Sequence, residues 1–503
     1  MSNEALPVEA AAGTATKPSE RRLSGSLGPV SIAFMVVAAA APLTVVSATS
    51  INALVSNGPG IAFAYLVGSA LMLLFVVGYM AMTPHVRRPG AFYAYVTAGI
   101  NRATGIGVSF IALLTYLSLA IGVYVFFGFI ASLEVDRWTS GALSLSWWQW
   151  SAIAMVVAGV LGYLNIEFSA KVLFVALCLE VLLVVVVSIA ILIKGGGPEG
   201  ISATSWLRSD VINHAGGLGM GVLFGVSIFG GIEATAIFRD EARTPERTIP
   251  RATYGAVIGV AIFYVFAIWS FLQAYGVGGF ADAVAGNPGD LYLATAMQFV
   301  GSVIANVVSV MLLTSMFASV LSYHNILARY LHALGTRRVL PGHLGSVHGT
   351  QLSPHIASVT VTVGSLALIG LWASSGLDPV AQVFPWHIAV ATIALIVMFI
   401  VTSASVVGFF ARNPLDKRLW NTKIAPVVSI VLLAGVLVMA YKNFALLTGE
   451  IPAWGSFLLA VMPFLALGVG LVIALWLRTS RPEVYADLSD LGEDELHSTV
   501  VHD

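Results

Sequence analysis

Long apolar runs separated by short polar segments dominate this chain. A helix needs about 20 mostly apolar residues to cross a bilayer, and twelve runs approach or exceed that length. Pro245 and Pro250, which precede the seventh run, predict a loop there rather than a continued helix. The pattern predicts an all-α membrane protein with twelve transmembrane helices. The runs are Pro29–Val55, Ile61–Thr83, Ile106–Leu133, Trp148–Leu164, Lys171–Ile193, Gly217–Phe238, Tyr254–Tyr275, Phe299–Tyr323, Ile356–Ala373, Phe384–Phe410, Ile424–Tyr441 and Trp454–Leu477.

Composition supports a membrane protein. Of the 503 residues, 58% are hydrophobic and 10% are charged, whereas a soluble domain carries roughly 25% charged residues. The net charge of -1 and the lack of a basic patch argue against nucleic-acid binding. The single cysteine, Cys178, excludes an intrachain disulfide, and its apolar surroundings in the sequence predict a small packing residue.

The basic residues predict the orientation in the membrane. With twelve spans, 20 of the 24 Lys and Arg residues fall on one side, and the other four are Arg137, Lys194, Arg208 and Lys442. Cytoplasmic loops carry the excess of Lys and Arg, so both termini are expected in the cytoplasm. The polar ends, 1–26 and 479–503, predict disordered cytoplasmic tails, the second of them acidic. The expected location is the plasma membrane, which is the inner membrane in a bacterium.

Two of the runs are interrupted in mid-membrane. In the first, Pro42 lacks an N–H group and disrupts the preceding turn. In the sixth, Gly230 and Gly231 permit non-helical backbone angles just before Glu233. Interrupted helices at matching places in two halves of a chain point to the binding site of a transporter, where free N–H groups can bind an anion and free carbonyl groups a cation. A proline kink and a close-packed glycine pair are the structural alternative.

Three stretches resemble the amino acid–polyamine–organocation (APC) superfamily. "FGGIEATAIFRDEARTPERTIPRATY", from Phe229, is similar to its sixth helix and the following loop. "HNILARYLHALGTRRVLPGHLGSVHGTQLSPH", from His324, resembles the loop after its eighth helix, and "RRPGAFYAYV", from Arg87, resembles the loop between its second and third helices. The resemblance covers roughly residues 25 to 480. It is specific for the superfamily and weak for the substrate.

The resemblance implies the leucine-transporter-like fold. Two inverted five-helix repeats would occupy 27–198 and 199–412, and the peripheral helices eleven and twelve would occupy 413–478. The substrate would lie between the broken first and sixth helices. The residues implied there are Ala39, Ala40, Ala41, Pro42, Phe229, Gly230, Gly231, Ile232 and Glu233.

The first helix departs from the family pattern. Amino acid permeases of this group usually have a Gly-Ser/Ala-Gly stretch where this chain has Ala39 to Ala41 followed by Pro42. The alanines keep their N–H groups, whereas the proline removes one donor for a substrate carboxylate. An amine or an unusual amino acid is therefore an alternative to an ordinary amino acid.

Coupling to an ion has two candidate sites. Glu180 lies among apolar residues, and an intramembrane carboxylate is a functional candidate by default. By its position on the fifth helix it falls where proton-coupled relatives have a lysine, so the resemblance suggests a proton site, and a structural hydrogen bond is the alternative. Thr314, Ser315 and Ser319 could instead bind sodium, although helix hydroxyls more often bond to their own backbone.

The sequence therefore predicts a secondary active transporter, or permease, for amino acids or related small amines. It would work by alternating access with proton coupling, and it would need no cofactor. A polyamine or monoamine carrier and an amino acid exchanger are alternatives within the same class, and a membrane receptor is one from another class. An enzyme is not expected, because no nucleophile with a base and no metal-ligand set is found in the runs.

Overall fold

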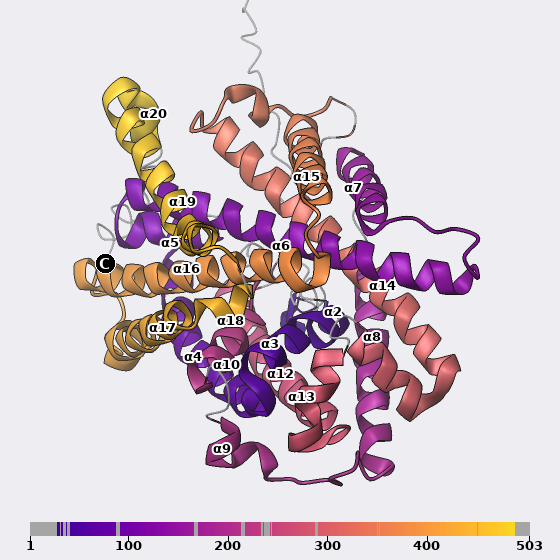
Figure 1. Ribbon diagram of the computed structural model, residues 1–503. Helices are drawn as coiled ribbons and strands as arrows, with labels where there is room; N and C mark the ends of the chain where they lie inside the picture. Colours follow the sequence, from indigo (N-terminus) through magenta and orange to yellow (C-terminus); the bar gives the residue numbers. More distant parts are fainter. Residues whose placement is uncertain are drawn as a thin grey trace, which may run out of the picture.

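The computed structural model describes most of the apolar part of the chain. The described residues are 28–30, 32–33, 37, 41–86, 91–164, 170–212, 217–232, 235, 242, 244–286, 290–349, 351, 353–449 and 451–487. Helices make up nearly all of them, which confirms the all-α class (Figure 1). The helices with labels in Figure 1 are α2 (Pro42–Thr44), α3 (Ser50–Asn57), α4 (Ile61–Met82), α5 (Ala91–Gly99), α6 (Arg102–Trp138), α7 (Trp147–Tyr163), α8 (Ala170–Ile193), α9 (Ser209–Ile212), α10 (Gly217–Ser227), α12 (Pro245–Gln273), α13 (Gly276–Gly286), α14 (Leu291–Thr336), α15 (His355–Ser375), α16 (Phe384–Arg412), α17 (Ala425–Lys442), α18 (Phe444–Thr448), α19 (Ala453–Ser480) and α20 (Pro482–Asp487).

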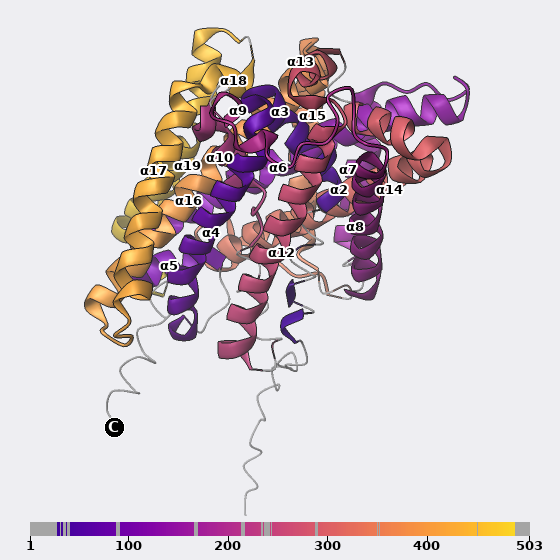
Figure 2. The ribbon, with the colours of Figure 1, turned by 90° about the horizontal axis from the view of Figure 1, so that it is seen from below.

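Nine helical segments in the described part of the chain are long and apolar enough to cross a membrane. In Figure 2 the long helices α4, α8, α12 and α17 run in roughly the same direction, and the short helices α9, α13 and α18 gather at one end. The sixth run appears as the shorter apolar helix α10, and the first run contains α2 and α3. The total of twelve spans and the two inverted repeats remain predictions.

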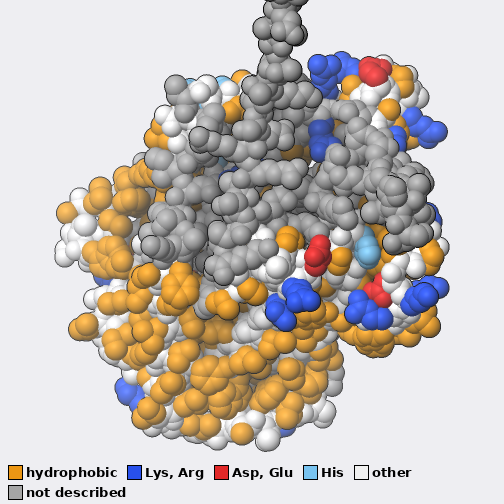
Figure 3. Space-filling model, turned by 180° about the vertical axis from the view of Figure 1, so that it is seen from behind, with side chains coloured by type: hydrophobic (Ala, Val, Ile, Leu, Met, Phe, Trp, Pro, Cys, Tyr) orange, Lys and Arg blue, Asp and Glu red, His pale blue; other side chains and the backbone are white. Residues whose placement is uncertain are grey.

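The surface of the bundle suits a lipid environment. Side chains such as Leu182 of α8, Val431 of α17 and Val472 of α19 are more than half exposed. Hydrophobic side chains cover a broad area of the lower part of the face in Figure 3. Cys178 is exposed on α8, so the prediction that it packs inside the protein is wrong. Apolar residues occupy both the exposed and the packed sides of α8, as exposed Leu179 and buried Leu177 show, and only a third of its apolar window is buried.

The prediction of a loop at Pro245 and Pro250 is also wrong. Helix α12 begins at Pro245, with Thr244 at its N-cap position and Pro250 inside it. A proline fits the first helical position, because the N–H group that it lacks would have no helical partner there. Pro250 lies just over one turn further on and removes one backbone hydrogen bond, which the 29-residue helix tolerates.

Two glycines allow the helices next to the second break to pack closely. A Cβ atom at Gly68 of α4 would lie 2.6 Å from the carbonyl carbon of Gly225 in α10. A Cβ atom at Gly225 would lie 2.8 Å from the carbonyl oxygen of Ala64. Small residues at such contacts let helix backbones approach each other in a membrane. Helix α10 is thereby held against α4 just before the chain leaves helical geometry.

We expect Gly68→Ala to lower the thermal unfolding midpoint of the purified protein. The new methyl group would push α4 from α10, and such overpacking costs about 1–3 kcal/mol. Gly259→Ala in α12 is the control, because a Cβ atom there meets nothing within 4 Å. Alanine favours a helix more than glycine does, so the control should unfold at the same or a higher temperature. Equal losses in the two variants would contradict the close packing.

Candidate functional site

The first break lies at Ala41. Its φ of 47° and ψ of 78° place it in the left-handed region, which costs a non-glycine residue roughly 1–2 kcal/mol. The helical stretch that follows begins with α2 at Pro42, continues as a π-helix over Val45–Thr49 and ends with α3. Pro42 has no N–H group, so Leu43 carries the first free backbone donor of this half-helix. This new N-terminus is buried inside the bundle.

Glu180 binds that N-terminus. The N–H group of Leu43 donates a hydrogen bond of 3.3 Å to Glu180 Oε2, which comes from α8. Glu180 is buried, with only 5% of its surface exposed. Negative charge at a helix N-terminus is favourable, because the free N–H groups carry partial positive charge. Glu180 therefore caps the broken first helix from the fifth predicted span.

A third helix joins this contact. Thr44 Oγ1 and Ser315 Oγ lie 3.2 Å apart, which links the first span to α14. The Ser315 hydroxyl also hydrogen bonds to Glu180. Among the ion pairs between described residues, none provides Glu180 with a basic partner. A buried carboxylate without a counter-charge is costly in its ionised form, and taking up a proton removes that cost.

The second break begins where α10 ends at Ser227. Turns follow over residues 228–232, and Gly231 has a φ of 96°, which glycine adopts without strain. Phe229 and Ile232 on either side of it are each 3% exposed. Glu233 lies outside the described residues. The glycine pair therefore does mark a departure from helical geometry, as its sequence predicts.

Gly231→Ala should lower the thermal unfolding midpoint, because an L-residue at this φ costs about 1–2 kcal/mol. Gly230→Ala is a matched control one residue away. Its Cβ atom would meet only Ser227 O at 3.3 Å and Leu395 Cδ2 at 3.4 Å, close to ordinary contact distances. We expect a smaller loss for this control. A loss as large as that of Gly231→Ala would show that local crowding, rather than the positive φ, limits substitution at the break.

A cavity of about 60 Å³ lies between the two breaks. Its walls come from the first span, α6, the second break, α14 and α16, five segments that are far apart in the sequence. Hydroxyl groups are interspersed with aliphatic and aromatic side chains, and no described lining residue carries a charge. The lining residues are Thr44, Val45, Ala48, Thr49, Leu119, Val123, Phe126, Ser227, Ile228, Gly230, Ser319, Tyr323, Phe384, Ile388 and Thr392.

The structure brings some of the predicted site residues to this cavity and leaves others apart. Gly230 and Ser319 line it. Glu180 and Ser315 lie beside it, next to Leu43 and the lining residue Thr44. Ala41, Pro42, Phe229, Gly231 and Ile232 shape the breaks but do not line the cavity. Ala39, Ala40 and Glu233 lie outside the described residues.

Thr314 is separate from this group. It is exposed on α14, and its hydroxyl donates to the backbone oxygen of Met311 at 3.0 Å. Ser315, one residue later, points to a different side of the helix and contacts Thr44. Successive residues on a helix point about 100° apart, so neighbouring hydroxyls seldom share a site. The three hydroxyls proposed for sodium therefore do not converge.

The sequence did not predict most of the residues that line the cavity; of these, only Gly230 and Ser319 were expected at the site. Thr44, Thr49 and Ser227 could have been proposed from the sequence, because each is a hydroxyl residue within eight positions of a break. Nothing in the sequence singled out Phe126 of α6 or Thr392 of α16, since each lies inside a long and mostly apolar helix. Only the packing of α6 and α16 across the bundle brings them to the breaks.

Comparisons with known proteins find a similar fold and similar sequences. The solved structure of MhsT in complex with L-phenylalanine has a similar fold, with a TM-score of 0.52, 15% sequence identity, and coverage of 83% of this chain and 99% of that one. The "Uncharacterized amino acid permease YtnA" of Bacillus subtilis is 24% identical over 439 residues, which are 82% of this chain and 89% of that protein.

A second relative matches over a shorter region. The "Aromatic amino acid transport protein AroP" of Escherichia coli is 26% identical over 227 residues, 43% of this chain, so the match spans about half (47%) of that relative's length. The family match is longer, because residues 32–485 fit the description "Amino acid permease". The chain therefore belongs to the amino acid permease family, a class of membrane transport proteins and not of enzymes.

Proposed function

We propose that this protein carries amino acids across the plasma membrane by alternating access, with a proton bound at Glu180 in each cycle. The observation that carries the proposal is the cavity between two broken helices, beside a buried carboxylate that caps one of them. Alternating access requires a site that both faces of the membrane can reach in turn, and a break in each of two helices supplies the hinge points. Both termini would lie in the cytoplasm, as the basic residues predict.

The cavity favours an amino acid with an apolar side chain. An amino acid zwitterion can pair its carboxylate with free N–H groups and its ammonium group with free carbonyls at the helix breaks. The apolar walls, which include Phe126, Val123 and Ile388, would then take the side chain. AroP is named for aromatic amino acids, and MhsT was solved with L-phenylalanine. Both relatives support such a substrate.

A polyamine is the weaker candidate. Each of its ammonium groups would need a carboxylate or several oxygen ligands inside the membrane. The described lining residues supply hydroxyl and backbone groups but no carboxylate. The one described carboxylate nearby, Glu180, is already engaged with Leu43 and Ser315.

Proton coupling is favoured over sodium coupling by the same contacts. A sodium site would need several converging oxygen ligands. Thr314 is turned away, and the Ser315 hydroxyl already contacts Thr44. Glu180, in contrast, is buried at the point where three helices meet, so gain or loss of its charge would act on all three.

The test is uptake into liposomes containing the purified protein. The panel should include labelled phenylalanine, leucine, alanine, lysine and spermidine, each with an inward proton gradient, an inward sodium gradient or no gradient. We expect concentrative uptake of the apolar amino acids, driven by the proton gradient alone. Uptake of spermidine in preference to them would refute the substrate assignment, and dependence on sodium would refute the coupling assignment.

A further inference from the structure

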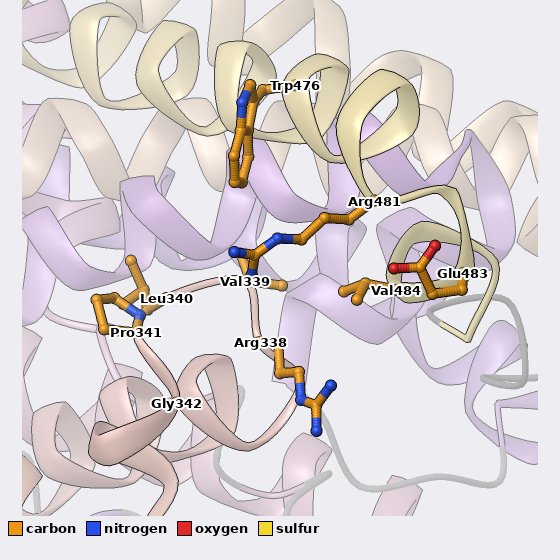
Figure 4. A pocket seen from close by; sticks show the side chains of 9 residues that line it. All are labelled: Arg338, Val339, Leu340, Pro341, Gly342, Trp476, Arg481, Glu483 and Val484. Atoms are coloured by element: carbon orange, nitrogen blue, oxygen red, sulfur yellow. The ribbon is translucent and has the colours of Figure 1, made fainter.

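A second and larger pocket, of about 650 Å³, shares no lining residue with the cavity of the proposed transport site. Figure 4 shows the residues that line it. Its walls are the segment after α14, from Arg338 to Gly342, and the end of α19 with the start of α20. This volume is within the range of small-molecule binding pockets. On the proposed orientation, the pocket lies at the cytoplasmic end of the bundle.

The pocket is preformed, because residues in its wall belong to a tightly packed apolar cluster. Val339 and Leu477 are 6% and 0% exposed and belong to one cluster, against which Val484 of α20 packs. Arg102 of α6 donates from Nη1 to the backbone oxygen of Tyr485 at 3.4 Å, and this contact ties α20 to the bundle. The apolar wall and the short helix are thus fixed in place without a ligand.

Arg481 is held over an aromatic ring at the pocket. Its Cζ atom lies 5.2 Å from the centre of the Trp476 ring, a cation–π distance. Figure 4 shows the Arg481 side chain reaching between Trp476 and Val339. Trp476 is 48% exposed near the end of α19, and tryptophan there is typical of the membrane interface. On the proposed orientation, the guanidinium group would lie near the lipid headgroups.

Arg338 has an unusual backbone. Its φ is 57°, and the N–H groups of Arg338 and Val339 bond to Gly335 O and Leu334 O, both at 2.9 Å. This is the Schellman pattern that ends a helix, and glycine normally occupies the left-handed position because it adopts this φ without strain. Here an arginine bears the strain. It is one of the residues that line the pocket, and in Figure 4 its side chain extends away from Arg481. A strained non-glycine residue is a reason to look for a role of its side chain.

We propose that this pocket binds an anionic phospholipid of the inner leaflet. The headgroup phosphate would bind Arg481, and Arg338 would turn from the pocket wall toward it. An acyl chain would run along Leu340 and the exposed side of α19. Guanidinium groups suit phosphate because several N–H donors meet its oxygens. Basic pockets between transmembrane helices on the cytoplasmic side bind such lipids. Among the described residues, neither arginine forms an ion pair, and Glu483 is the one acidic side chain at the rim. The inference does not depend on the transported substrate.

Native mass spectrometry of the solubilised protein tests this site. Phosphatidylglycerol, phosphatidylcholine and inorganic phosphate are the probes. Wild type should bind phosphatidylglycerol more tightly than phosphatidylcholine. Each arginine near a membrane surface contributes a factor of about five, so Arg338→Gln/Arg481→Gln should weaken phosphatidylglycerol binding by roughly 30-fold. The control Lys423→Gln/Arg478→Gln removes two exposed charges from the same end of the bundle, outside the pocket, and should leave this affinity within about twofold of wild type.

A further variant separates binding from folding. Arg338→Gly relieves the positive φ and removes one cation, so its unfolding midpoint without lipid should equal or exceed that of wild type while its affinity for phosphatidylglycerol falls about fivefold. Equal affinities of wild type and both arginine variants would overturn the proposal. So would binding of inorganic phosphate as tight as that of the lipid, because the pocket would then be a site for free phosphate.

Discussion

Glutamine in place of Glu180 should abolish proton-driven accumulation of the amino acid. The amide can still accept the hydrogen bond from Leu43, so the cap on the broken helix is kept, but it cannot take up or release a proton. A gradient of one pH unit can support about tenfold accumulation per coupled proton, and this factor should fall to about one in Glu180→Gln. Uptake of labelled phenylalanine into liposomes with and without the gradient measures it.

Two controls separate coupling from damage. Exchange of labelled for unlabelled phenylalanine across the liposome membrane needs no net proton movement, so Glu180→Gln should retain it. Glu180→Asp keeps a titratable group and should keep part of the accumulation. If Glu180→Gln still accumulated phenylalanine tenfold under the gradient, Glu180 would be only a helix cap, and the proton would have to bind elsewhere.

The size of the cavity should set the preferred substrate. Ala48→Leu fills space beside the first break and should shift uptake toward small amino acids such as alanine. Val123→Ala removes two methyl groups from another part of the wall, on α6, and should shift uptake toward larger ones such as phenylalanine. One methylene in an apolar pocket changes discrimination by about 10-fold or more, so the ratio of phenylalanine to alanine uptake should move by at least that factor in each case.

The opposite directions of the two shifts make this a strict test. Destabilisation of the protein would lower the uptake of both amino acids and leave their ratio unchanged. Ratios that moved in the same direction, or not at all, would show that the substrate lies outside this cavity. The measurement is the initial rate of competitive uptake of the two amino acids by the same liposomes.

Part of the structure could be predicted from the sequence. The long apolar runs predict the helices because every backbone group in a lipid environment must bond within its own segment. Pro42, Gly230 and Gly231 predict departures from helical geometry, since each alters the allowed backbone directly. Proline is common both in loops and at the first position of a helix. Pro245 is therefore predicted to lie in a loop, although it is the first residue of α12.

The residues that line the cavity, and the side to which each helix residue points, could not be predicted from the sequence. Whether Ser315 or Thr314 faces the first span depends on the rotation of α14 about its axis, which its apolar sequence does not fix. The exposed Cys178 shows the same limit, because in a membrane helix both the lipid-facing and the packed sides are apolar. Phe126 and Thr392 reach the cavity only through the packing of distant helices.

The most direct test of the central claim is the internal pH of liposomes that contain the protein and a trapped pH indicator. Phenylalanine is added outside with no imposed ion gradient, to wild type and to Glu180→Gln. We predict that the interior of wild-type liposomes acidifies as phenylalanine enters and that the interior of Glu180→Gln liposomes does not. Entry of phenylalanine into wild-type liposomes with no change of internal pH would contradict the account.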